Sequence, residues 1–253
     1  MTFKAFDGLI WLLLMLGPFL FLQRRVHHEI QAVFWLTFRH AEVAMILFAV
    51  LFFPGVFLHE ASHFLAAKIL RVRTGRVSLL PRVLPKGKLQ LGFVEIYPTD
   101  GIREALIGLA PLLTGGLLVA WIGMDALALQ PLGAVIFEGK LDLIAPTLAQ
   151  TVMQPDFGIW FYLAFAISSS MLPSESDRRT WLPMVIFIGL MAGLVLLAGA
   201  GPWLMENLGP VVNEMLRSAA LVFAISLLMH VVIWAPVVLV RKLLNRVTGL
   251  VVE

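Results

Sequence analysis

The stretch GVFLHEASHFLAA, residues 55–67, places two histidines and a glutamate within an apolar run long enough to cross a membrane. His59 and His63 are four residues apart, so on an α-helix they lie on one face, about 5–6 Å from each other. Two imidazoles at this spacing can bind a single zinc ion, and Glu60 beside them can act as a general base toward water. Ionisable residues inside a span are costly and indicate a functional site. The alternative is that the three side chains satisfy one another within a packed bundle.

The composition around this stretch is typical of a membrane protein. Of the 253 residues, 60% are hydrophobic and only 14% are charged, and the mean hydropathy is +0.91. Soluble domains carry about 25% charged residues. The chain has no cysteine, which excludes disulfides and thiolate metal ligands. Its net charge of +3 is small and its basic residues are dispersed, which argues against a nucleic-acid partner. We therefore expect an all-α polytopic protein whose partner is the lipid bilayer.

Six apolar segments approach the roughly 20 residues that a spanning helix needs. The predicted spans are 8–22, 41–70, 104–123, 156–172, 181–201 and 218–240. We expect the first to be a retained span that ends at residues 23–25, because no small-residue cleavage site follows it. Residues 124–155 are mildly apolar with Gly and Pro, which predicts an interfacial loop that holds a short helix. No repeat or linker divides the chain, so we expect residues 1–253 to form a single integral-membrane domain.

Residues 72–97 differ from the rest of the chain. Residues 72–78 are rich in β-branched and small side chains, and the run KLQLGF, residues 88–93, alternates apolar with polar or small side chains. Between them, PKGK at residues 85–88 is a turn signal. This pattern predicts a β-hairpin or small sheet attached to the membrane face, and a basic surface loop is the alternative.

The distribution of basic residues predicts the orientation. Six spans put both termini on one side of the membrane, and 14 of the 19 Lys and Arg residues fall on that side. Basic residues favour the cytoplasmic side of a membrane. The two termini, the β-rich segment and the active-site end of the protein are therefore predicted to be cytoplasmic.

A third metal ligand should come from another part of the chain. A catalytic zinc commonly has three protein ligands and one position open to water. Asp177 is the best candidate, because Pro173 breaks the fourth predicted span and nearby serines can satisfy the freed backbone groups. Glu175 is the runner-up. For Asp177 the alternative is an ordinary surface carboxylate beside Arg178 and Arg179.

The other histidines give weaker signals. His230 lies alone in an apolar run, which favours a packed or hydrogen-bonded side chain over a metal ligand. His27 and His28 lie beside two arginines, which predicts a solvated or headgroup-facing cluster.

In the order of these motifs the sequence resembles the site-2 protease family of intramembrane zinc metalloproteases. The HEASHF stretch lies late in its span, and the β-rich segment follows it. GLAPL at residues 108–112 is similar to the family's Ala-Gly-Pro-Leu stretch, and residues 170–177 are similar to its Asn-x-x-Pro…Asp-Gly motif. The resemblance implies that Asp177 completes the zinc site. It covers residues 41–180, which would form the metalloprotease core, whereas residues 181–253 would form two further spans and a tail.

Two positions depart from the family pattern. Ser170 stands where the family has Asn, and Arg178 stands where it has Gly. In the family that Asn is thought to hold the substrate or the oxyanion, so the resemblance leaves this role to Ser170 or Ser169. No inserted PDZ-like domain interrupts the sequence, so regulation by such a domain is not expected.

The resemblance implies zinc-dependent hydrolysis of peptide bonds in a transmembrane protein or peptide substrate. The alternation of Leu89, Leu91 and Phe93 predicts an edge strand to which an unwound substrate segment can add. Two other classes remain open: an inactive membrane scaffold of the same fold, and a zinc transporter or sensor. A Glu60→Gln substitution separates protease from transporter, because only the protease needs the base.

Overall fold

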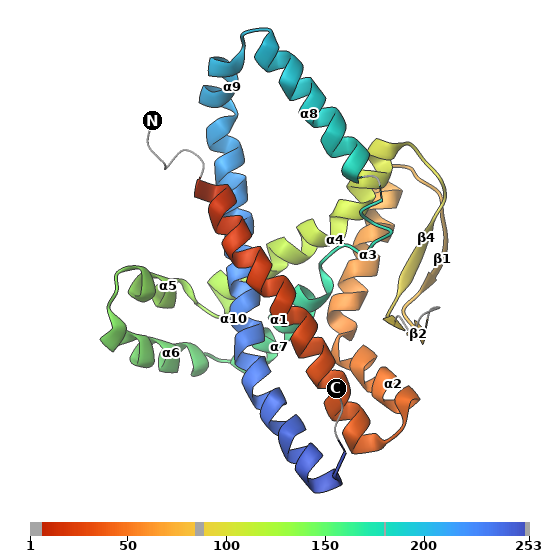
Figure 1. Cartoon of the computed structure of the whole chain (residues 1–253), viewed down its shortest axis with the longest axis vertical. Coiled ribbons are helices and arrows are strands. Elements are labelled where there is room, and N and C mark those ends of the chain that lie inside the picture. The colour runs from red at the N-terminus through yellow and green to blue at the C-terminus, as the bar shows by residue number, and fades with distance from the viewer. Residues whose placement is uncertain (1–6, 84–88, 180, 251–253) are drawn as a thin grey trace.

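A computed structural model describes residues 7–83, 89–179 and 181–250 of the chain, and most of them are helical (Figure 1). The helices are α1 (Asp7–Phe38), α2 (Ala41–Leu51), α3 (Phe53–Ile69), α4 (Gly101–Trp121), α5 (Gln130–Phe137), α6 (Ile144–Val152), α7 (Phe157–Ser170), α8 (Trp181–Leu197), α9 (Gly201–Asn207) and α10 (Gly209–Thr248). A π-helical turn, Ile122–Ala126, extends α4, and a 3-10 turn, Leu141–Leu143, precedes α6. The strands are β1 (Thr74–Ser78), β2 (Arg82–Val83), β3 (Leu89–Gln90) and β4 (Phe93–Ile96).

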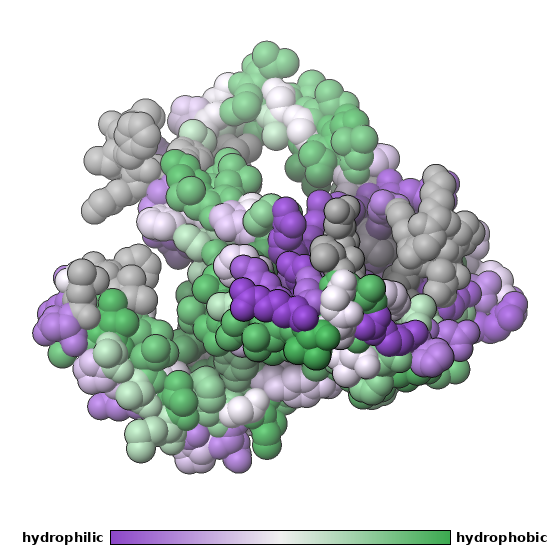
Figure 2. All heavy atoms as spheres, turned by 60° about the horizontal axis from the view of Figure 1, so that its bottom comes forward, coloured by the Kyte–Doolittle hydropathy of each residue, from purple (hydrophilic) through white to green (hydrophobic). Residues whose placement is uncertain are grey.

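Four helical stretches of the described chain are long and apolar enough to cross a membrane, so the chain is a membrane protein by length and composition. They are Asp7–Phe38, Ala41–Ile69, Gly101–Ala126 and Gly209–Thr248. Hydrophobic residues cover large parts of the face in Figure 2, and hydrophilic residues gather in separate patches. The other two predicted spans correspond to α7 and α8, with 14 and 17 residues. At 1.5 Å per residue these helices are about 21 and 26 Å long, shorter than a hydrocarbon core of about 30 Å. The orientation stays a prediction.

The first span is longer than the sequence indicates. Helix α1 continues through residues 23–25 to Phe38, so the predicted end at residue 22 is wrong. Gln23 is buried, and its side-chain amide donates a hydrogen bond to the backbone carbonyl of Ser169 at 2.7 Å. The two arginines that follow lie on the exposed side of the helix. The polar residues therefore pair or face outward without ending the helix.

The second predicted span, 41–70, is divided at Phe52 into α2 and α3. Pro54 has no N–H to continue the helical hydrogen-bond pattern, which favours a break at this point. The backbone carbonyl of Leu51 accepts a hydrogen bond from the hydroxyl of Tyr162 on α7 at 2.9 Å. The break therefore fixes α7 against the junction of α2 and α3, two turns before His59.

Helices α1 and α10 cross in the middle of the molecule and form its most extensive helix pair (Figure 1). Phe19 of α1 packs against Phe223 of α10 with ring centroids 5.6 Å apart, and both rings belong to the main hydrophobic core. At one end of the pair the guanidinium of Arg217 forms two hydrogen bonds of 2.8 Å with the carboxylate of Asp7. Helix α10 also packs against α4 and α7, so the first and last helices support the helices in between.

The β-rich segment forms two short antiparallel pairs beside α3, which confirms the predicted small sheet (Figure 1). In the outer pair, β1 and β4, Val77 lies opposite Val94 and Ser78 opposite Phe93. In the inner pair, β2 and β3, Arg82 lies opposite Gln90. The predicted turn at residues 85–88 lies outside the described residues. We call residues 74–83 and 89–96 the ribbon.

Two parts of the chain lie at the margins of the bundle. The predicted interfacial segment, residues 124–155, contains α5 and α6, which project from the side of the bundle (Figure 1). Helix α8 has no buried side chain within the described chain. The core that positions the polar residues of the second span therefore consists mainly of α1, α3, α4, α7 and α10.

Candidate metal centre

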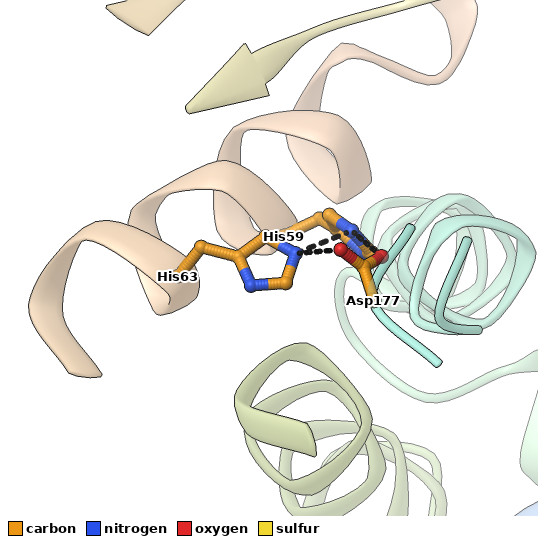
Figure 3. Close-up of side chains that lie close together, drawn as sticks. All are labelled: His59, His63 and Asp177. Atoms are coloured by element: carbon orange, nitrogen blue, oxygen red, sulfur yellow. Dashed lines mark hydrogen bonds and ion pairs between the residues drawn. The ribbon is translucent and has the colours of Figure 1, made fainter. Parts of the chain in front are cut away.

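Helix α3 places the two histidines of the HExxH stretch on one face, as the sequence predicts. The Nε2 atoms of His59 and His63 are 3.1 Å apart, and both rings point toward Asp177 (Figure 3). Their side chains are 12% and 6% exposed, so both are largely protected from solvent. Ser62, between them on the helix, packs against α4, where its hydroxyl lies 2.6 Å from that of Thr114. A small residue at position 62 thus allows α3 and α4 to approach each other at the site.

Hydrogen bonds from the far side of each ring fix which nitrogen faces the centre. Nδ1 of His59 lies 2.7 Å from the backbone carbonyl of Ser170, and Nδ1 of His63 lies 2.9 Å from that of Ile107. A carbonyl oxygen can only accept, so each Nδ1 must carry the proton and donate it. In the neutral imidazoles both Nε2 atoms then present a lone pair to the same point. This is the arrangement by which second-shell carbonyls orient metal-binding histidines.

Asp177 reaches the same point from the loop after α7 (Figure 3). Its Oδ1 lies 3.4 Å from Nε2 of His63, and its Oδ2 lies 3.7 Å from Nε2 of His59. Among the described residues, His59, His63 and Asp177 form a group that could hold a metal ion. The runner-up, Glu175, lines the adjacent cavity but is not a member of this group. The carboxylate selected by the sequence argument is therefore the one that meets the histidines.

The loop holds Asp177 through its own backbone and through close contact with α4. The backbone N–H of Ser174 donates to Oδ2 of Asp177 at 2.7 Å, and the N–H of Asp177 donates to the hydroxyl of Ser174 at 3.3 Å. On the α4 side, a Cβ atom added to Gly108 would lie 2.2 Å from the backbone oxygen of Asp177. Only glycine at position 108 permits this approach, so the GLAPL stretch of α4 positions the loop.

The donor set fits a metal ion. Two lone pairs and a carboxylate converge within 3.1–3.7 Å, which is repulsive unless a proton or a metal cation lies between them. Ligands about 2.0–2.2 Å from a tetrahedral zinc lie roughly 3.3–3.5 Å from one another, close to these separations. Burial raises the pKa of the Asp177 carboxyl, but hydrogen bonds donated by the protonated forms of the two histidines and by Ser174 outweigh burial and hold this pKa well below its usual range. Asp177 is therefore an anionic donor at neutral pH.

Glu60 lies beside the cluster in the wall of a cavity of about 850 Å³. Glu60 is only 8% exposed as a whole residue. The ribbon approaches it so closely that a Cβ atom added to Gly92 would lie 2.9 Å from Cγ of Glu60. The cavity is also lined by His59, His63 and Asp177, so the predicted base and the three predicted ligands share one space.

The predicted oxyanion residues Ser169 and Ser170 line this cavity, but their hydroxyls make hydrogen bonds within the protein. The hydroxyl of Ser170 donates to the carbonyl of Ala166 at 3.1 Å. Nδ1 of His230 lies 2.7 Å from the carbonyl of Ser226 and must donate to it, which leaves Nε2 to accept from the hydroxyl of Ser169 at 3.0 Å. The prediction that His230 is a packed, hydrogen-bonded residue is confirmed, since it is fully buried.

The predicted edge strand borders the cavity in part. Leu91 and Phe93 line it, together with the backbone neighbours Gly92 and Val94. Leu89 lies in the inner pair of the ribbon, opposite Val83, and its side chain lies outside the described residues. Residues 90–94 therefore form the part of the ribbon that a ligand in the cavity would meet.

Sequence reasoning missed His27. It was expected in a solvated or headgroup-facing cluster, but its ring packs against Phe48 and Phe52 and lines the cavity. Gln23, His27 and Gln31 are spaced by four residues, which places them on one face of α1. This polar stripe on an apolar helix is the signal that could have identified His27.

In comparisons with protein-family models, with curated proteins and with solved structures, nothing matched this chain.

Proposed function

We propose that this protein is an intramembrane zinc metalloprotease of the site-2 protease type. The observation that carries the proposal is the convergence of His59, His63 and Asp177 beside Glu60 in the wall of a single cavity. The order of the sequence motifs, with the resemblance to that family over residues 41–180, supports it. The substrate class that fits a site built on an apolar helix is a membrane-spanning or membrane-associated polypeptide.

Zinc is the metal that suits this donor set best. Two imidazoles and one carboxylate form a three-ligand set of the kind that catalytic zinc sites use, with one position left for water or substrate. Bound zinc polarises a scissile carbonyl and lowers the pKa of water from 15.7 to about 7. Asp177 adds a negative charge, and the carbonyls of Ser170 and Ile107 hold the two rings in the metal-binding tautomer.

Glu60 is the general base in this proposal. Its carboxylate takes a proton from the attacking water and later gives that proton to the nitrogen of the leaving amine. Its position next to His59 in the chain places it at the same wall of the cavity as the ligands. Because both serine hydroxyls are engaged elsewhere, a second oxyanion donor is not assigned to Ser169 or Ser170.

The ribbon gives an unwound substrate a place to bind. A helical backbone is closed to attack, so the substrate must be extended at the scissile bond, and its freed peptide groups then need hydrogen-bond partners. Residues 90–94 border the cavity next to Glu60. We propose that the substrate adds to this edge as a strand.

The direct test is cleavage of a panel of single-span substrates by the purified chain, with metal analysis. We expect one zinc per chain and substrate cleavage in the wild type. Glu60→Gln should bind the same amount of zinc but cleave about 10²–10⁴-fold more slowly, which is the usual contribution of a general base.

Each other outcome identifies a different class of protein. A zinc-loaded wild type that cleaves none of the panel would support a scaffold. Glu60→Gln that retains a zinc-dependent function would support a transporter or sensor. Absence of bound metal from the wild type would refute the proposed site itself.

A further inference from the structure

A polar group that the proposed chemistry does not use lies at another part of the same cavity. His27 of α1 lines this cavity together with Gln31, one turn further along the helix. Nε2 of His27 is buried and has no hydrogen-bond partner among the described residues. Leaving such a nitrogen buried and unpaired is unfavourable, because it has lost its hydrogen bonds with water. A ligand in the cavity can supply the missing partner.

Two phenylalanine rings pack against the imidazole of His27. Its ring lies edge-on to Phe48 at a centroid distance of 5.4 Å, and 4.8 Å from the ring of Phe52. These contacts hold the imidazole in place but offer no conventional hydrogen bond. The Cβ–Cγ torsion of histidine has broad minima, so a rotation about this bond can turn Nε2 toward the cavity that the side chain lines.

The contact of His27 with Phe52, directly before α3, gives its approximate distance from the candidate metal centre. Phe52, which the imidazole contacts, precedes His59 by seven residues, which corresponds to about 10 Å along a helix. Val56, between them, also lines the cavity, so the space is continuous along this face of α3. An extended chain advances about 3.3–3.6 Å per residue, so 10 Å corresponds to about three residues of substrate.

We propose that His27 binds a main-chain peptide group of the substrate about three residues from the scissile bond, with Gln31 beside it. This inference rests on the proposed protease function and adds a second binding element to the ribbon. A membrane-spanning segment has few polar side chains, so the polar groups that it always brings are its peptide N–H and C=O, which are freed when it unwinds. A neutral imidazole can donate to the carbonyl or accept from the N–H. His27 is thus a substrate-binding residue and takes no part in the chemical step.

The test compares steady-state kinetics of the zinc-loaded full chain on a synthetic single-span peptide that the wild type cleaves. His27→Phe keeps an aromatic ring between Phe48 and Phe52 but removes the polar nitrogen. One lost hydrogen bond should raise KM about three- to tenfold and leave kcat unchanged. His27→Gln carries a polar group near the position of Nε2 and should recover most of the affinity. His40→Phe, at an exposed histidine outside the cavity lining, is the matched control and should behave as wild type.

A second measurement locates the contact on the substrate. Peptides with a single ester in place of the amide at each position near the scissile bond lose one N–H and carry a weaker acceptor. An ester about three residues away should raise KM for the wild type but add little to the effect of His27→Phe, because both changes remove the same interaction. Additive effects at every position, an unchanged KM for His27→Phe, or a fall in kcat alone would overturn the inference.

Binding separates this inference from the proposed function. The dissociation constant of the uncleaved peptide is measured with Glu60→Gln and with the Glu60→Gln, His27→Phe double variant. A three- to tenfold weaker affinity in the double variant supports the His27 contact even if the wild type fails to cleave. Equal affinities in a protein whose wild type does cleave overturn the His27 contact and leave the protease function standing.

Discussion

Two non-helical segments reach the cavity, and they are held in different ways. The loop at residues 173–179 holds Asp177 through hydrogen bonds with Ser174 and through contact of its backbone with Gly108. The ribbon reaches Glu60 through Gly92, and neither β1 nor β4 contains a buried residue. The loop, which also lacks a buried residue, is therefore held by hydrogen bonds among its own residues and by close contact with α4, whereas the ribbon meets Glu60 by packing at Gly92. This difference agrees with the proposal that the loop supplies a metal ligand and that the ribbon binds substrate.

Removal of Asp177, the proposed metal ligand on the loop, should have the largest effect on zinc affinity. Asp177→Asn keeps the shape of the side chain but removes the anionic donor between the two histidines. Loss of a second-shell partner costs about 10–100-fold in metal affinity, so loss of the ligand should cost at least about 100-fold. Competition with a chelator, followed by metal analysis, measures the change. Glu175→Gln, two residues earlier, is the matched control and should retain wild-type affinity; if both variants bind zinc equally well, Asp177 is not a ligand.

Displacement of the loop should have an intermediate effect. In Gly108→Ala the new Cβ would lie 2.2 Å from the backbone oxygen of Asp177, so the loop must move away from α4. We expect about a 10–100-fold loss of zinc affinity, as for a residue that orients a ligand, and a lower midpoint of thermal unfolding. Gly116→Ala on the same helix, where the nearest atom lies at 3.7 Å, is the control. Zinc affinity equal in both variants would show that the loop does not depend on α4.

A change in the ribbon should have the smallest effect and should spare the metal. Leu91 lies between β3 and β4 and lines the cavity, so Leu91→Pro removes an N–H outside the ladder. Loss of one main-chain hydrogen bond to substrate should reduce kcat/KM about 2–13-fold with unchanged zinc content. Leu79→Pro, between β1 and β2 and outside the cavity lining, is the control. Unchanged turnover would argue against strand addition. Loss of zinc would show that the ribbon, like the loop, contributes to metal binding.

The parts of the site that sequence could predict are those set by helix geometry and by the free-energy cost of ionisable side chains inside a membrane span. His59 and His63 follow from helical spacing alone. Asp177 follows from the need for a third ligand near a helix broken by proline, and α7 does end at Ser170, shortly before Pro173. The ribbon follows from its alternating side chains. In each case the pattern lies within a few residues of the chain and needs no knowledge of distant contacts.

The features that sequence could not predict depend on partners far along the chain. Gln23 looks like the end of a span until the carbonyl of Ser169 is placed beside it. Ser169 looks free to donate to a ligand until Nε2 of His230 is found to accept its hydrogen bond. His27 looks like a surface residue beside arginines until Phe48 and Phe52 enclose it. In all three cases tertiary packing decides the role of a polar residue, whereas its neighbours in the sequence predict a different role.

The contact between Ser169 and His230 also has a consequence for biosynthesis. His59, His63 and Asp177 all leave the ribosome before the last helix, α10, has been made. On α7 behind the site, the carbonyl of Ser169 accepts a hydrogen bond from Gln23 of the first helix, and its hydroxyl donates one to His230 of the last. That partner does not exist until 230 residues have been synthesised. The order of synthesis therefore completes the hydrogen bonds of Ser169, behind the candidate metal centre, after His59, His63 and Asp177 have all been made.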